Sequence, residues 1–124
     1  MKTHKIKFRP LKGFDLWIRV KYHPSQKSLL RVYTKHVADD EILGGFATLM
    51  PEPEKRGGHL ATIHMGPKLF GPEFASHEAT HVVNYLVKVA HLDLDHGGSE
   101  ELSAIAVGRI TKKILESAPK GWHK

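Results

Sequence analysis

The sequence contains no cysteine. This absence excludes disulfide bonds, thiolate metal sites and catalysis by a cysteine nucleophile. Any bound metal ion would therefore have to be held by histidine, aspartate and glutamate side chains. Histidine is plentiful, with 10 residues in a chain of 124.

Long hydrophobic runs are also missing. No segment approaches the roughly 20 apolar residues that cross a membrane, and residues 1–7 lack the apolar core of a signal peptide. A hydrophobic content of 40% and a charged content of 26% are typical of globular proteins. We expect a single domain over residues 1–124, located in the cytoplasm and without contact to a membrane.

Acidic side chains are scarce near the start of the chain. Residues 1–36 hold ten lysines or arginines but only one acid, Asp15, and the net charge of the whole chain is +6. Such a basic region is typical of a protein that meets an acidic partner or nucleic acid, although a solvated surface produces the same pattern.

The most informative motif is His-Glu-Ala-Thr-His at residues 77–81. On a helix, residues four apart lie on the same face, so His77 and His81 can direct two imidazoles at one metal ion. Glu78 would then reach a water molecule at the metal as a general base. The pattern predicts a zinc-dependent hydrolase. A helix with two surface histidines would have the same sequence, so the surrounding residues must decide between the two interpretations.

The first part of the chain has the pattern of strands. Apolar and polar residues alternate over residues 16–22 and 30–36, and further apolar runs cover residues 42–50 and 59–65. The connections between these runs are short, which favours antiparallel pairing. We therefore predict a small antiparallel sheet of about four strands within residues 1–70.

Residues 71–118 have the pattern of two helices. Proline fits the first turn of a helix, and Pro72 opens one that continues to about His91. Ser99 is a candidate N-cap of the second helix, which ends before Pro119. Strands followed by helices indicate an α+β fold, and the two helices would carry the metal site.

A third metal ligand is expected, because catalytic zinc commonly has three protein ligands and one open position. Glu100 and Glu101 lie in the first turn of the second helix, where they could face the first helix or merely complement the helix dipole. The helical face that continues from Glu101 carries small residues, namely Ala104, Gly108 and Thr111. That face could lie close against the first helix, so Glu101 is the favoured third ligand.

HExxH followed by a glutamate 20 residues after the second histidine resembles the gluzincins, the thermolysin-type zinc peptidases. Residues 59–114 are also similar to small metallopeptidase-like proteins of bacteriophages and prophages. The resemblance implies a zincin-like fold, a Zn²⁺ cofactor held by His77, His81 and Glu101, a peptide or protein substrate, and a phage or prophage origin. It further implies an edge strand before the active-site helix, lining the cleft where an extended substrate lies. Residues 59–65 occupy that place in the sequence.

Two features depart from the gluzincin pattern. An acidic residue often stands four positions after the third ligand, and here that residue is Ile105. A carboxylate that accepts a hydrogen bond from His77 or His81 would have to come from Asp93 or Asp95. The chain is also shorter than most peptidases and lacks a second lobe to close a deep cleft. The metzincin pattern is excluded, since it requires glycine and histidine where this chain has Asn84 and Val87.

Zinc hydrolases usually contain a group that stabilises the oxyanion formed on the substrate. His64 and Tyr85, one helical turn beyond His81, are the candidates; a packed strand histidine and a core tyrosine are the alternatives. His91 is excluded as third ligand, because ten further helical residues place it about 15 Å from His81. The connector between the helices contains Asp93, Asp95 and His96. These residues could bind a second ion or simply form a solvated loop.

The sequence thus predicts a zinc metallopeptidase-like hydrolase in which Glu78 accepts a proton from the attacking water and passes it to the leaving amine. An alternative from another class is a non-catalytic zinc-containing protein that binds nucleic acid or an acidic partner. Its binding surface would be a basic sheet face with interleaved aromatic residues. The residues of that face would come from two neighbouring strands: Trp17, Arg19, Lys21, Arg31, Tyr33 and Lys35.

Overall fold

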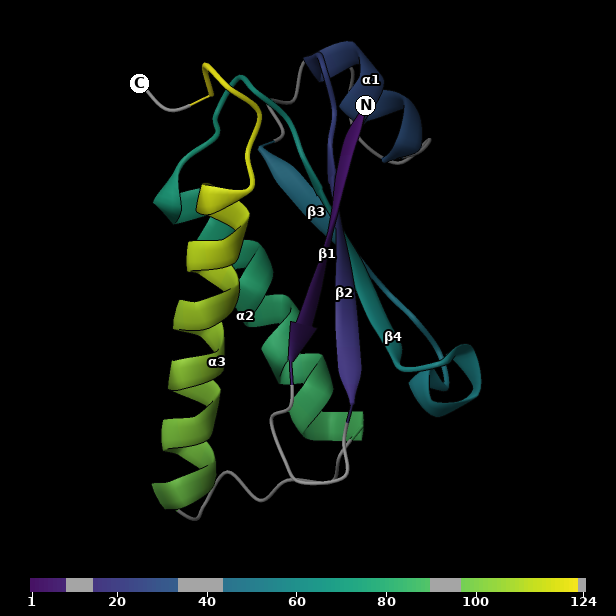
Figure 1. The fold of residues 1–124 in the computed structure, drawn as a ribbon, viewed down its shortest axis with the longest axis vertical. Helices are drawn as coiled ribbons and strands as arrows, with labels where there is room; N and C mark the ends of the chain where they lie inside the picture. The colour runs from purple at the N-terminus through teal and green to yellow at the C-terminus, as the bar shows by residue number, and fades with distance from the viewer. Residues whose placement is uncertain (9–14, 34–43, 90–96, 123–124) are drawn as a thin grey trace.

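The computed structural model describes residues 1–8, 15–33, 44–89 and 97–122. Four strands form one sheet in the order β1-β2-β4-β3, and two long helices lie together on one side of it (Figure 1). The strands are β1 (Lys2–Phe8), β2 (Leu16–Tyr22), β3 (Gly45–Leu49) and β4 (His59–Met65). The helices are α1 (Gln26–Val32), α2 (Pro72–Val89) and α3 (Gly97–Glu116), with a short 3₁₀ helix η1 (Pro53–Arg56) before β4. The predicted α+β class is confirmed.

The sheet is mixed, so the prediction of a wholly antiparallel sheet is wrong. β1 pairs antiparallel with β2 and β3 pairs antiparallel with β4, but β2 and β4 run parallel in the centre. A parallel pair needs a long crossover connection, and here the crossover contains α1 and β3. The sequence-based argument fails because it assumes that strands joined by short connections pair with each other.

Helix α1 replaces the strand predicted at residues 30–36. The side chain of Ser25 accepts a hydrogen bond from the backbone amide of Ser28 at 3.1 Å and so caps the helix. Leu29 turns inward and is fully buried. Capping and the burial of Leu29 therefore outweigh the period-two pattern of residues 30–36. Residues 34–36 of that predicted strand lie outside the described part of the chain.

β3 and β4 follow the predictions closely, whereas β1 and the start of α3 do not. β4 coincides with the strand expected at residues 59–65, and β3 lies within the run at 42–50. β1 has no counterpart in the sequence analysis, because only Ile6 among its central residues is a strong strand former. α3 begins at Gly97, so Ser99 lies inside its first turn and is not its N-cap.

The hydrophobic core lies between the sheet and the two long helices. Buried residues of β2 and β4 face the buried residues of α2 and α3: Ile18, Val20, Ile63, Met65, Ala75, Ala79, Val82, Val83, Leu86, Ile110 and Ile114. Burying each large aliphatic side chain contributes about 1.5–3 kcal/mol to folding. The Tyr22 hydroxyl also donates a hydrogen bond to the Ile114 carbonyl at 2.7 Å, which ties α3 to the sheet.

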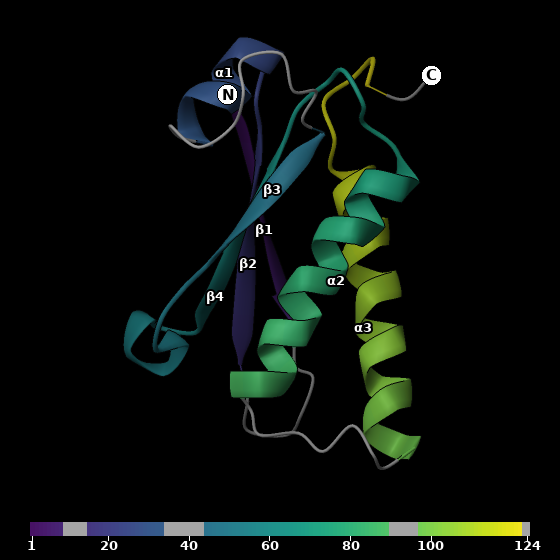
Figure 2. The ribbon, with the colours of Figure 1, turned by 180° about the vertical axis from the view of Figure 1, so that it is seen from behind.

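The other face of the sheet is not covered by the two long helices. Figure 2 shows α1 beyond the strands from α2 and α3, at one end of the molecule. There Tyr33 contacts Phe46, and Phe46 stacks on His64 with ring centroids 4.4 Å apart. No helix in the described ranges has the length and apolar character that a membrane crossing requires.

Candidate metal centre

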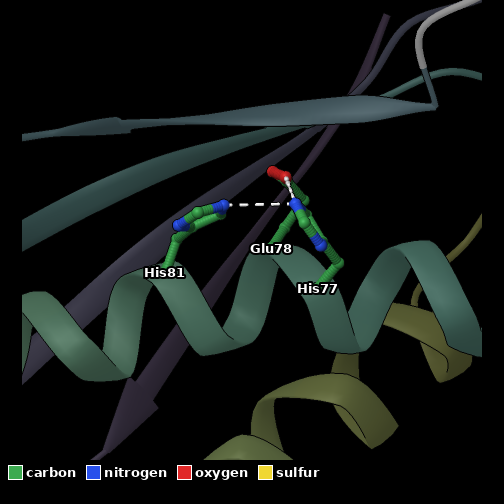
Figure 3. A group of neighbouring side chains, drawn as sticks. All are labelled: His77, Glu78 and His81. Atoms are coloured by element: carbon green, nitrogen blue, oxygen red, sulfur yellow. Dashed lines mark hydrogen bonds and ion pairs between the residues drawn. The ribbon is translucent and has the colours of Figure 1, made fainter.

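Helix α2 brings the two motif histidines together. His77 and His81 lie one turn apart on the same helical face, and their Nε2 atoms are 3.1 Å apart. Their rings meet edge to face with centroids separated by 4.7 Å. Figure 3 shows both imidazoles projecting from α2 toward the sheet, on the side of α2 away from α3. The side chain of His77 is 66% exposed, so the pair is open to solvent.

Glu78 stands beside this pair in a different environment. Only 4% of the residue is exposed, and one carboxylate oxygen, Oε1, lies 3.9 Å from Nε2 of His77. The other oxygen, Oε2, is buried and has no hydrogen-bond partner among the described residues. Burial raises the pKa of Glu78 above its ordinary value, while His77 and His81 act in the opposite direction. A buried carboxylate oxygen without a hydrogen-bond partner is an unusual and costly feature in a small protein.

The three side chains form a group that could hold a metal ion. One ligand atom from each of His77, Glu78 and His81 lies within 4.8 Å of the other two. Two nitrogen ligands of a tetrahedral zinc ion are about 3.3 Å apart, and the two Nε2 atoms already stand at 3.1 Å. The unpaired oxygen of Glu78 offers a further acceptor for an ion or for a water molecule. The predicted pair of imidazole ligands is thus brought together with the predicted base.

The face of α2 that carries His77 and His81 lies against β3, which is an edge strand. The hydroxyl of Tyr85, one turn beyond His81, donates a hydrogen bond to the carbonyl of Met50 at the end of β3. At the other end of β3, the absence of a side chain on Gly44 makes room for the ring of Phe74. Tyr85 therefore anchors the helix to this strand, and its hydroxyl proton is already used.

The edge strand is not the one expected from the sequence. Residues 59–65 form β4, which lies between β2 and β3 in the interior of the sheet. β3 pairs only with β4 in the described part of the chain, so its outer edge is unpaired. The resemblance to zincins implies that the strand directly before the helix lies at the edge, whereas here β3 takes that position.

His64 is not brought to the metal centre. Its neighbours in β4, Ile63 and Met65, are fully buried and face the helices, so His64 points to the opposite side of the sheet. A role for His64 in stabilising an oxyanion beside His77 and His81 does not fit this position.

His64 instead belongs to a buried polar chain that the sequence analysis missed. Nδ1 of His64 lies 2.9 Å from Nε2 of His23, and Nδ1 of His23 lies 2.9 Å from the Ser28 hydroxyl. Burial lowers the pKa of His64 to about 4, with further contributions from His23 and Lys21. Burial also lowers the pKa of His23. His23 and His64 are 41 residues apart, and no local motif signals such a contact.

Apart from Glu78, no described residue near the two histidines supplies a third ligand. Glu101 is exposed on α3 and is not a member of the group formed by His77, Glu78 and His81. Helix α3 lies on the side of α2 opposite to the metal-binding side chains (Figure 3). The side chain of Glu100 is not among those described. The connector residues discussed in the sequence analysis also lie outside the described ranges: His91, Asp93, Asp95 and His96.

The predicted basic sheet face is present in altered form. Trp17, Arg19 and Lys21 alternate with buried residues of β2 and share the face that points away from α2. Tyr33 and Arg31 belong to α1 or its end and not to a neighbouring strand, which corrects that part of the prediction. The neighbouring strand is β1, and Lys35 lies outside the described residues.

Comparison of the chain with protein-family models, curated proteins and solved structures finds no match.

Proposed function

We propose that this protein is a zinc-dependent, metallopeptidase-like hydrolase. The observation that supports the proposal is the grouping of His77, Glu78 and His81, whose ligand atoms lie within 4.8 Å of one another. The grouping combines two exposed imidazoles with a buried carboxylate that has an unpaired oxygen. This combination matches the chemistry that HExxH requires, namely two metal ligands and a base beside them.

When bound, zinc would lower the pKa of a water molecule and polarise a substrate carbonyl. His77 and His81 would hold it through their Nε2 atoms. Glu78 accepts a proton from the attacking water and delivers it to the leaving amine. Because burial raises the pKa of Glu78, its carboxylate accepts a proton more readily than an ordinary glutamate does. The mostly buried position also holds the carboxylate in a fixed orientation.

The substrate would lie in an extended conformation along β3. Within the described part of the chain, the outer edge of β3 has no strand partner, and such an edge accepts an added strand by main-chain hydrogen bonds. The Tyr85–Met50 hydrogen bond holds this edge beside the metal-binding face of α2. A peptide paired with β3 would therefore pass the two histidines. This part of the proposal rests on the resemblance to zincins as well as on the geometry.

The experiment that tests metal binding is elemental analysis of protein purified without a histidine tag. We expect about one zinc per chain, retained through dialysis, and a loss of zinc in His81→Ala. The matched control is His4→Ala, which removes a histidine from β1, away from the cluster. Zinc retained equally by both variants would reject the site.

A second experiment tests hydrolysis. Zinc-loaded protein is incubated with an unfolded protein substrate and with a mixture of peptides, and cleavage is followed by mass spectrometry. We expect cleavage that a chelator stops and added zinc restores. Stable zinc binding without cleavage of any substrate would reject the hydrolase and leave a metal-binding protein.

A further inference from the structure

The face of the sheet opposite the metal centre carries a concentrated positive charge. Lys5 and Lys7 of β1 and Arg19 and Lys21 of β2 all alternate with residues that face the core. Lys5 and Arg19 stand directly opposite each other in the antiparallel register. None of the outward-facing residues of the four strands is acidic. Like charges directly opposite each other destabilise a sheet, so this arrangement indicates an anionic partner.

An aromatic pair lies next to two of these charges. The ring of Trp17 stacks on the ring of His59 with centroids 4.0 Å apart and planes within 6° of parallel. The Lys5 ammonium nitrogen is 4.3 Å from the Trp17 ring centroid, and the Arg19 guanidinium carbon is 5.3 Å from it. Both cations thus lie over the Trp17 ring, whose other face is stacked on His59.

Hydrogen bonds fix both rings in place. The Trp17 indole nitrogen donates to the carbonyl of Gly57 at 3.0 Å. Nε2 of His59 lies 3.1 Å from the carbonyl oxygen of Ala61, to which it must donate. Burial lowers the pKa of His59, and the positive charges of Arg19, Arg56 and Lys5 lower it further. Three cationic side chains from three different elements therefore act on one aromatic pair.

We propose that this face binds single-stranded nucleic acid. The basic sheet face is defined by six residues: Lys5, Lys7, Trp17, Arg19, Lys21 and His59. Its cations contact backbone phosphates and so move off the Trp17 ring, whose face then contacts bases. Single strands use this combination because their bases are free to stack. A flat sheet offers no helix or ribbon for a duplex groove. An acidic peptide would match the charge but would make no use of the aromatic pair.

This proposal is independent of the proposed hydrolase. The basic sheet face and the metal-binding side chains lie on opposite sides of the sheet, and no residue belongs to both. A His81→Ala variant should lose zinc and still bind nucleic acid. The failure of either proposal can therefore be recognised without reference to the other.

The test is fluorescence anisotropy with a labelled single-stranded oligothymidylate of about 15 nucleotides, using the full chain at low and moderate salt. The double variant Lys5→Gln/Arg19→Gln removes two charges from the face. The control Lys88→Gln/Lys113→Gln removes two charges from exposed positions of α2 and α3. We expect the first variant to weaken binding by about tenfold and to reduce the salt slope by about 1.4, and the control to change binding by less than about twofold.

Several outcomes would overturn the proposal. One is the absence of binding to the oligonucleotide, and another is an equal loss of affinity in both double variants. A third is that a duplex or a polyglutamate peptide binds as tightly as the single strand. A second readout does not depend on these variants. In Trp122→Phe protein, Trp17 is the remaining tryptophan, and we expect saturable quenching of its fluorescence by the oligonucleotide, reversed by salt. Binding without any change in Trp17 emission would also contradict the proposal.

Discussion

Two pairs of histidines in this molecule have almost the same internal geometry but opposite surroundings. His77 and His81 place two ring nitrogens 3.1 Å apart on the surface of α2, beside a buried carboxylate. His23 and His64 place two ring nitrogens 2.9 Å apart across two segments of the sheet layer, where 0% and 4% of the residues are exposed. The distance between imidazoles is therefore not what distinguishes a metal-binding pair.

The surroundings make the difference. The exposed pair has a carboxylate with a free oxygen and an open path to solvent. The buried pair has the Ser28 hydroxyl on one side and the ring of Phe46 stacked on the other. Besides burial, the positive charge of Lys21 lowers the pKa of both histidines. A cation nearby disfavours a second cation. We expect the first pair to bind metal and the second to act as a packed, neutral element of the fold.

The largest expected difference between the two histidine pairs is the effect of their substitution on bound zinc. His81→Ala should reduce bound zinc from about one per chain to almost none, because a single imidazole and Glu78 remain. His64→Ala should keep its zinc, although it creates a cavity and leaves His23 with an unpaired nitrogen, at a cost of about 1–3 kcal/mol in stability. Elemental analysis and thermal denaturation of both variants measure this. Loss of zinc in a folded His64→Ala variant would contradict the conclusion that only the exposed pair binds metal.

The next prediction concerns the carboxylate that only the exposed pair possesses. Glu78→Gln should keep bound zinc but lower the rate of peptide hydrolysis by about 10²–10⁴-fold, since the amide cannot accept the proton. Steady-state kinetics of the zinc-loaded variant, beside its zinc content, provide the measurement. A variant that retains full activity would show that Glu78 is not the base.

The buried pair should become visible in the pH dependence of stability. The pKa of His64 is lowered from 6.5 to about 4 in the folded protein, so between these values the unfolded chain binds more protons. The free energy of unfolding should be constant above about pH 6.5 and should fall as the pH is lowered toward 4. The expected loss is on the order of 3 kcal/mol, which urea denaturation can resolve. His64→Gln is the control and should flatten this part of the curve.

The smallest expected effect tests the third ligand. Glu101 is exposed on α3 and lies outside the metal-binding group, so Glu101→Ala should change zinc affinity by less than about threefold. Competition with a fluorescent chelator measures the affinity, and Glu116→Ala on the same helix is the matched control. A tenfold or greater loss specific to Glu101→Ala would restore it as the ligand predicted from the sequence.

The contrast between the pairs also explains which features the sequence can predict. His77 and His81 are four residues apart on one helix, so helical periodicity alone brings them together. The partnership of His23 with His64 depends on how β2 and β4 pair, and Glu101 depends on how α3 packs against α2. The edge position of β3 likewise follows from the parallel pairing of β2 with β4. Local sequence patterns do not determine which distant strands or helices pack together. The prediction of a strand in place of α1 is wrong because alternation over a few residues is a weaker signal than the N-cap at Ser25.

The local nature of the HExxH pair has a thermodynamic consequence. A ligand stabilises a folded protein only to the extent that it prefers the folded chain over the unfolded one. A single turn of helix is enough to bring His77 and His81 together, so an incompletely folded chain can also hold zinc through both imidazoles. The preference for the folded state must then come from features that only tertiary structure provides, such as the burial of Glu78 and the neighbouring β3. Saturating zinc should therefore raise the melting temperature less than the affinity of the native site alone would imply.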